Sequence, residues 1–152
     1  MTYWIVVGSP ENFRIAIARG FDLFGFKSTR RRETGAMQPG DKLIFYLTGV
    51  MRFGGISSVT SEVFEDHTPI FESKKKPEED YPFRVRTQAD LILDEAGWLD
   101  VKEWAPQMAY TKKWPPEHWR LAFQGNLHQI PESDYRILEK EMRARSKTKA
   151  KA

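Results

Sequence analysis

Near its start the chain reads Tyr3-Trp4-Ile5-Val6-Val7-Gly8-Ser9-Pro10-Glu11-Asn12, a β-forming run that passes directly into the start of a helix. Ser9 is a favourable N-cap, Pro10 suits the first helical position, and Glu11 places an acid in the first turn. Gly20 then provides a stop signal. The opening therefore predicts a strand, a short helix and a glycine-terminated turn. The apolar face of that helix consists of Phe13, Ala16 and Ile17.

The next segments predict more strands. Residues 21–26 are apolar and aromatic without a helical period, which indicates a short strand or an extended loop. Residues 42–48 and 53–64 are rich in β-formers and flank a glycine-containing connection, so they predict an antiparallel hairpin. Gly54 and Gly55 within the second arm predict a bulge or a sharp bend.

The second half of the chain begins with a polar, proline-punctuated stretch at residues 65–82, which predicts a long loop. Residues 83–93 alternate as a half-buried strand does, with Arg84 on the polar face. Residues 119–123 are predicted as a short last strand, and a final helix opens at Pro131.

Together these elements favour an α+β fold, a mixed, mostly antiparallel β-barrel of five or six strands with flanking helices. No glycine-rich phosphate loop precedes a helix, which disfavours nucleotide-binding folds. A chain of 152 residues suits one domain, expected at residues 1–142, and residues 143–152 are expected to form a basic, disordered tail.

Composition excludes several classes of protein. The chain has no cysteine, which excludes disulfides, zinc-thiolate sites and thiol catalysis. No apolar run is long enough to span a bilayer, and nothing resembles a secretory signal, so we expect a cytoplasmic protein without a membrane partner. The net charge is only +3, but basic residues cluster in ways that could track phosphates or simply be solvated surface. The clusters are Lys27 with Arg30, Arg31 and Arg32, then Lys74 to Lys76, and the tail from Arg143 to Lys151.

Five segments, taken in order, resemble the EVE domain family over nearly the whole chain. The family has a PUA-like fold, related to the PUA domains of RNA-modifying enzymes and to the YTH readers of methylated adenine. The resemblance implies a non-catalytic module that binds a flipped, modified base in DNA or RNA. The segments are the opening run 3–12, Phe24-Gly25-Phe26-Lys27, Pro39-Gly40-Asp41-Lys42-Leu43-Ile44-Phe45-Tyr46, Phe53-Gly54-Gly55-Ile56 and Tyr81-Pro82-Phe83-Arg84-Val85.

The comparison with YTH readers implies an aromatic pocket. Phe24 falls where those domains place a cage tryptophan, and Phe71, with Tyr81 as its partner, falls in the loop that supplies the other cage aromatics. Ser9 and Asn12 lie at the strand-to-helix junction, where the related readers contact the base edge. Phe replaces Trp in the cage slots and the loop alignment needs gaps, which leaves the identity of the ligand open. The expected base pocket comprises Ser9, Asn12, Phe24, Gly25, Phe26, Tyr46, Phe71 and Tyr81.

Phosphate contacts are expected from Lys27, Arg30, Arg31, Arg52, Lys74, Lys75 and Lys76. No catalytic residue, cofactor or metal is expected. Plain structural roles compete with the functional ones. One of Phe24 and Phe26 is expected in the core, as is Trp4, and Ser9 is fully explained as an N-cap. Trp114 and Trp119, beside Lys112 and Lys113, are expected to be structural.

Two other functions stay open. A small-molecule sensor or protein-interaction module could use the same pocket. A metal-dependent nuclease would need Glu65-Asp66-His67 to assemble with His118 and His128, which nothing in their spacing indicates. The sequence does not decide between DNA and RNA, the base modification, the pathway or the oligomeric state.

Overall fold

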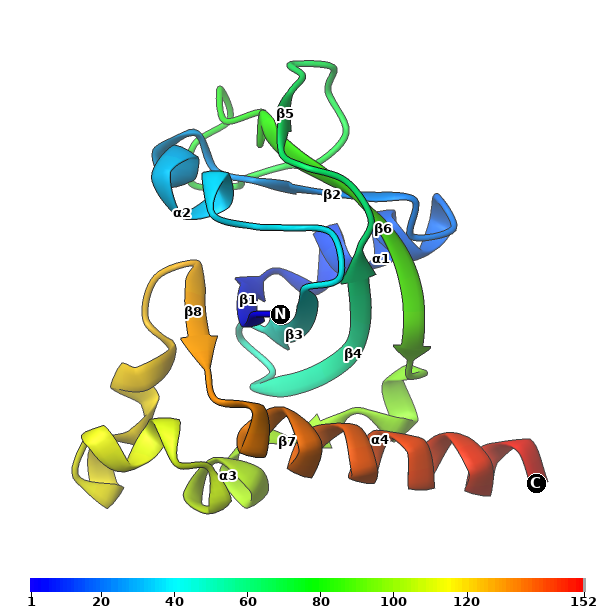
Figure 1. Cartoon of the computed structure of the whole chain (residues 1–152), viewed down its shortest axis with the longest axis vertical. Coiled ribbons are helices and arrows are strands. Elements are labelled where there is room, and N and C mark those ends of the chain that lie inside the picture. Colours follow the sequence, from blue (N-terminus) through cyan, green and yellow to red (C-terminus); the bar gives the residue numbers. More distant parts are fainter. Residues whose placement is uncertain (152) are drawn as a thin grey trace.

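The computed structural model describes the backbone of residues 1–151 and the side chains of residues 1–146. A curled, mixed sheet forms a half-barrel, and helices flank it, as the α+β prediction requires (Figure 1). The strand order is β2-β6-β4-β3-β1-β8, with β5 added to β6 and β7 to β4. The strands are β1 (Tyr3–Gly8), β2 (Leu23–Phe26), β3 (Lys42–Leu47), β4 (Arg52–Val59), β5 (Phe64–Glu65), β6 (Phe83–Ile92), β7 (Leu99–Asp100) and β8 (Leu127–Ile130).

The helices lie between the strands along the chain and flank the half-barrel. The long C-terminal helix runs across the bottom of the half-barrel in Figure 1. No helix among the described residues is long and apolar enough to cross a membrane. The α-helices are α1 (Pro10–Ala18), α2 (Arg31–Gly35), α3 (Val101–Trp104) and α4 (Glu132–Lys151), and the 3₁₀ helices are η1 (Ser28–Arg30), η2 (Glu95–Gly97), η3 (Ala105–Gln107), η4 (Tyr110–Lys113) and η5 (Pro116–Phe123).

Strand β1 has the parallel neighbour β3 on one side and the antiparallel neighbour β8 on the other. The chain leaves β1 through Ser9, whose hydroxyl accepts the N–H of Asn12 at 3.1 Å, and Pro10 begins α1 as the sequence predicts. Because β1 and β3 are parallel, their carboxyl ends lie side by side. The start of α1 and the β3–β4 turn therefore meet at the same edge of the sheet.

The two central glycines of β4 make the curl of the sheet possible. The register between β3 and β4 shifts at Phe45/Tyr46, so Gly54 is the extra residue of a bulge. A Cβ at Gly54 would lie 2.9 Å from the side chains of Leu47 and Phe13, and one at Gly55 would lie 2.6 Å from the Leu91 carbonyl oxygen. The predicted bulge is confirmed, and both positions require glycine.

An aromatic cluster fills the inside of the half-barrel. The ring of Phe45 lies 5.5 Å from Phe13, 5.1 Å from Phe21 and 5.0 Å from Phe24. All are buried, and burial of each such side chain contributes about 1.5–3 kcal/mol. Trp4 is buried as well, with its indole N–H donating to Asp41 at 3.1 Å.

Two sequence expectations are corrected. The predicted last strand at residues 119–123 is wrong, because this stretch belongs to the 3₁₀ helix η5, which begins at Pro116 directly after Pro115. The last strand is β8 instead, and it covers the otherwise open edge of β1. Arg84 does not lie on an exposed polar face, since its side chain is fully buried.

The sequence predicts a basic, disordered tail from residue 143, and this stretch begins within helix α4. Helix α4 continues past residue 142 to Lys151, so the expected boundary is not marked by a change in the backbone. Arg145 explains part of this, because it pairs with Glu141 at 3.1 Å and donates to the carbonyl oxygens of Gly97 and Trp98. Arg143 pairs with Glu139 one turn earlier. Ala152 lies outside the described residues.

Candidate base-binding pocket

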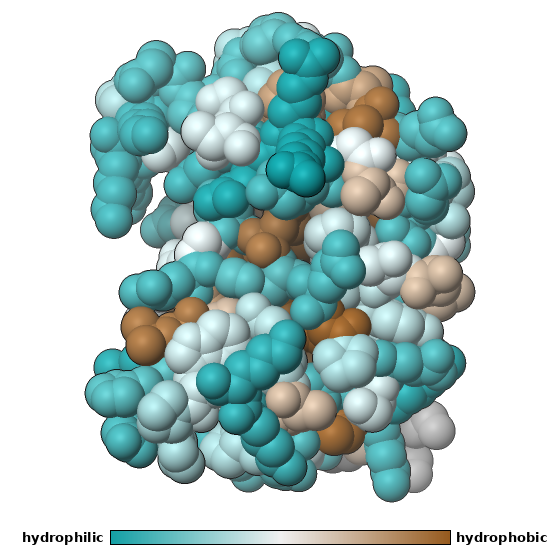
Figure 2. Space-filling view, turned by 60° about the vertical axis from the view of Figure 1, so that its left-hand side comes forward, coloured by the Kyte–Doolittle hydropathy of each residue, from teal (hydrophilic) through white to brown (hydrophobic). Residues whose placement is uncertain are grey.

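A pocket of about 790 Å³ opens where the carboxyl ends of β1 and β3 meet the loop before β6. Figure 2 turns forward the side of the molecule on which α2 and β8 lie in Figure 1, and it shows apolar patches among hydrophilic side chains. The lining comes from five separate parts of the chain, so it exists only in the folded protein. These are residues 6–12 of β1 and α1, 24–27 of β2, 48–50 of the β3–β4 turn, 72–75 with Tyr81 of the long loop, and Phe123, Gly125 and Asn126 before β8.

The structure brings together six of the eight residues predicted for the base pocket. Ser9, Asn12, Phe24, Gly25, Phe26 and Tyr81 all line it. Phe24 and Phe26 are almost fully buried, so each exposes only a small part of its surface. Phe71 lies behind this wall with its ring 5.0 Å from Phe24 and does not line the pocket.

Tyr46, the eighth residue, lies in the core. Its ring stacks on Phe123 at 4.8 Å, and burial raises the pKa of its hydroxyl. Phe123, rather than Tyr46, reaches the pocket. Sequence reasoning missed Phe123 because the stretch that contains it was predicted as a plain strand.

Gly25 allows the strand β2 to approach the long loop. A Cβ at this position would lie 2.8 Å from the Tyr81 carbonyl oxygen and 3.1 Å from the Phe71 ring. Even the smallest side chain would therefore push the loop away from the pocket.

Asn12 ties α1 to the same loop. Its side chain is 4% exposed, and its amide makes two hydrogen bonds to the backbone of Glu72, one donated to the carbonyl oxygen and one accepted from the N–H, both at 2.9 Å. This pairing leaves the amide little capacity for a base edge. Ser9 accepts from the Asn12 N–H and lines the pocket, and within the described part of the chain its hydroxyl makes no hydrogen bond as a donor.

Tyr81 is held in a strained conformation at the pocket wall, with φ of 50°. Its N–H donates to the Glu79 carboxylate at 3.0 Å, and its carbonyl oxygen accepts from Nε of Arg84 at 3.0 Å. The buried guanidinium of Arg84 also donates to the carbonyl oxygens of Asp80 and Thr68 and lies 3.5 Å from the Asp66 carboxylate. Arg84 thus fixes both ends of the long loop. The alternation of residues 83–93 places Arg84 on the polar face and does not predict this role.

The predicted phosphate contacts divide into two groups. Lys27, Lys74 and Lys75 line the pocket. Lys74 lies 3.6 Å from Glu11 on the opposite side of the opening, in an exposed pair. Positive charge is therefore present where a strand would enter.

The remaining cations lie further out. Arg30 donates to the Asn126 side-chain oxygen at 3.1 Å and so bridges to a residue of the pocket lining. Arg31 is exposed on α2, and Lys76 is exposed in the long loop, outside the lining. Arg52 does not line the pocket, and it pairs with Asp100 at 3.1 Å across the β4–β7 ladder.

The three histidines do not come together in one site. His67 bridges Glu65 and Asp80, His118 is exposed on η5, and Nδ1 of His128 lies 3.0 Å from the Tyr110 hydroxyl. Among the described residues, no group of three or more His, Asp or Glu side chains is placed to hold a metal ion.

The two hydrogen bonds of His67 predict that the contribution of the long loop to stability depends on pH. The bonds to Glu65 and Asp80 raise the pKa of His67. The bridge therefore stabilises the fold fully below about pH 6.5, the unperturbed histidine value, and loses this contribution as the pH rises through the higher pKa of folded His67. NMR titration should give His67 a pKa above 6.5, and the double variant Glu65→Gln, Asp80→Asn should return it toward 6.5. A wild-type value at or below 6.5 would contradict the bridge.

Comparisons with known proteins identify the family. The EVE domain model matches residues 2–141. UPF0310 protein PH1033 of Pyrococcus horikoshii is 27% identical over 150 residues, which cover 92% of this chain and 98% of that protein. UPF0310 protein PYRAB08750 of Pyrococcus abyssi is 29% identical over 148 residues, with 91% and 98% covered.

Solved structures share the fold at low sequence identity. A hypothetical protein from Leishmania major has a TM-score of 0.64 and 18% identity, with 96% of this chain and 97% of that chain covered. The YTH domain of Zygosaccharomyces rouxii MRB1, in complex with N6-methyladenosine RNA, has a TM-score of 0.65 and 11% identity, with 93% and 86% covered. The fold is thus also similar to that of YTH domains, as expected from the sequence. Because the EVE domain model matches residues 2–141, the chain belongs to the EVE domain family.

Proposed function

We propose that the protein is a non-catalytic nucleic-acid-binding module whose pocket accepts one flipped, modified base of RNA or DNA. The observation that carries the proposal is the pocket itself, whose lining combines aromatic side chains, the hydroxyl of Ser9 and three lysines. Its volume of about 790 Å³ falls in the range of small-ligand sites. The YTH neighbour solved with N6-methyladenosine RNA supports this choice of ligand class.

The roles divide by position in the pocket. Tyr81, which is partly exposed, would stack on the base, and stacking on an aromatic ring contributes about 1–3 kcal/mol per base. Phe26 would contact the base with the small part of its ring that is exposed. Ser9 would donate to the base edge. A methyl group buried against the apolar lining would add about 0.8 kcal/mol, roughly fourfold in affinity. Discrimination between modified and unmodified bases is therefore expected to be modest.

The flanking strand would be held through its phosphates. Lys27, Lys74 and Lys75 lie at the opening and would fix the strand without reading its sequence. Extraction of a base from a duplex costs a few kcal/mol, so single strands are the expected preferred ligands.

The test is a binding panel of nine-nucleotide single strands of RNA and DNA. Each carries a central adenine or cytosine, either unmodified or as N6-methyladenine, 5-methylcytosine or 5-hydroxymethylcytosine. The proposal expects preference for one modified base, a steep loss of affinity with salt, and the same result in EDTA and in Mg²⁺ with the strand recovered intact. No binding at low salt would contradict it. Cleavage that requires Mg²⁺ would indicate a nuclease instead, and salt-independent binding of a free small molecule would indicate a sensor.

A further inference from the structure

A second surface of aromatic rings and cations adjoins the pocket. It consists of η4 and η5 with the turn between them, residues 110–123, which Figure 1 shows in yellow below β8. The Nζ of Lys113 lies 5.4 Å from the centre of the Tyr110 ring, and the guanidinium of Arg120 lies 5.8 Å from the Trp119 ring. Trp114 lies 5.5 Å from Tyr110. We refer to residues 110–123 as the η4–η5 surface.

The cations of the η4–η5 surface are free of carboxylate partners. Lys112, Lys113 and Arg120 are exposed, and in the part of the chain with described side chains none of them lies within 4.0 Å of an acidic group. By contrast, Lys42 and Arg52 pair with Asp90 and Asp100.

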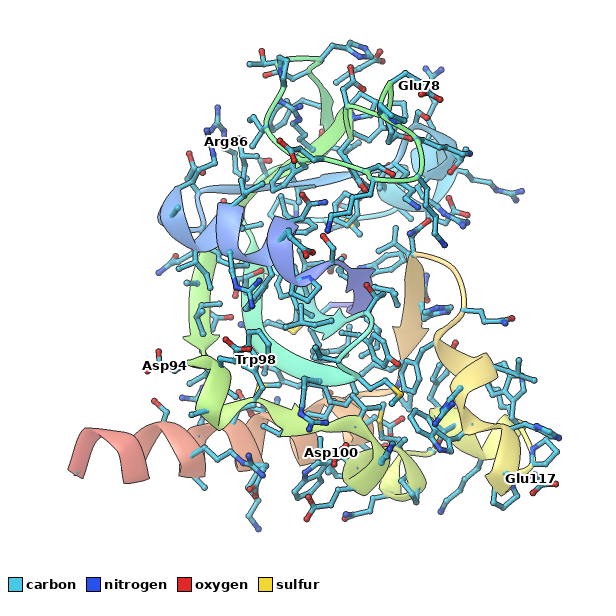
Figure 3. All side chains as sticks on the ribbon, turned by 180° about the vertical axis from the view of Figure 1, so that it is seen from behind. Glu78, Arg86, Asp94, Trp98, Asp100 and Glu117 are labelled. Atoms are coloured by element: carbon cyan, nitrogen blue, oxygen red, sulfur yellow. The ribbon has the colours of Figure 1, made fainter. Side chains whose placement is uncertain are left out.

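The acidic content of the surface is low. Its one acidic residue is Glu117, which lies at the outer end of the segment in Figure 3. The surface is therefore positive, and its charge is available to an outside anion.

The surface is continuous with the pocket. Trp119 lies 6.1 Å from Phe123, and Phe123 lines the pocket together with Gly125 and Asn126. Arg120 is close enough to the Tyr46 hydroxyl to oppose the rise in its pKa that burial causes. The rings and cations of the surface thus begin where this part of the pocket lining ends, on a different segment from Lys27, Lys74 and Lys75.

Nucleic acid is the partner that this combination fits. A base held in the pocket has a neighbouring nucleotide on each side, so a bound strand needs contacts beyond the pocket lining. Partly exposed Trp and Tyr rings can stack on unpaired bases of any sequence, and free Lys and Arg side chains release counterions from phosphates. We infer that the η4–η5 surface binds the single strand that leaves the pocket, an inference that rests on the proposed function.

The test removes the three free charges with Lys112→Gln, Lys113→Gln and Arg120→Gln together. The side chains are exposed, so the melting temperature should stay close to the wild-type value. Both proteins are titrated with the modified nine-mers of the panel and with the corresponding free nucleosides. The triple variant should bind the preferred nine-mer about tenfold more weakly and lower the slope of log K against log salt by about 2, because each lost contact to a single strand counts about 0.7. Its affinity for the free nucleoside should not change.

A matched control removes the same charge elsewhere, with Arg19→Gln, Arg86→Gln and Lys140→Gln. These side chains are also exposed, and Arg86 lies at the upper left in Figure 3, whereas Glu117 of the η4–η5 surface lies at the lower right. This control should keep the wild-type slope. An unchanged slope in the first triple variant, or an equal loss in the control, would overturn the inference and leave the proposed function standing. If the wild-type protein binds neither the nine-mers nor the nucleosides, the proposed function itself fails.

Discussion

Replacement of Arg84 by Met is expected to lower the free energy of unfolding by about 3 kcal/mol, which is the largest stability effect that we expect outside the glycines. The side chain is fully buried and donates to the carbonyl oxygens of Thr68, Asp80 and Tyr81. Methionine keeps the apolar stem of the side chain but has no donor, so these acceptors would stay unsatisfied or would turn outward with the loop. Urea denaturation monitored by circular dichroism measures the change.

The control for this variant is Arg86→Met, two residues along the same strand. Arg86 is exposed and covers the Phe64 ring at 5.4 Å, so its loss should change the free energy of unfolding by no more than about 0.5 kcal/mol. If the two variants were equally stable, the buried hydrogen bonds of Arg84 would not hold the loop as described.

Replacement of Gly8 by Leu is expected to abolish base binding while the fold is kept. Gly8 lines the pocket, has an ordinary strand backbone, and a Cβ built on it meets no atom within 4 Å. The leucine side chain would occupy open space that the base needs. We expect the affinity for the preferred nine-mer to fall about 100-fold, which corresponds to about 2.7 kcal/mol and to the loss of most stacking energy.

Gly35→Leu is the matched control for Gly8→Leu. Gly35 also has open space around its Cβ position and lies at the end of α2, outside the pocket lining. Both variants should unfold near the wild-type temperature, and only Gly8→Leu should lose binding. Wild-type affinity in Gly8→Leu would show that the base binds elsewhere.

Local signals explain what could be predicted from the sequence. The N-cap Ser9 and the helix start at Pro10 depend on neighbouring residues alone, and both are confirmed. The glycine pair in β4 marks a bulge because no larger side chain fits there. These features fix the β1–α1 junction, and with it the position of the pocket.

The rest of the site depends on contacts between distant parts of the chain. Asn12 makes two hydrogen bonds to the backbone of Glu72, sixty residues away, and no local sequence pattern in either segment predicts them. Arg84 departs from the alternation of its strand because the long loop folds over it and supplies carbonyl acceptors. Whether an aromatic residue such as Tyr46 or Phe123 reaches the pocket depends on packing in three dimensions. The functional roles of the lining residues stay predictions.

The central claim, that a single base enters this pocket, is tested most directly by titrating ¹⁵N-labelled protein with the nine-mer that the panel prefers. Amide resonances of Gly8, Gly25 and Asn126, which line the pocket on three different segments, report on its interior. The account predicts that all three shift together and saturate with the dissociation constant measured for the whole strand. Shifts confined to the exposed lysines and arginines, with the three pocket amides unmoved, would contradict it.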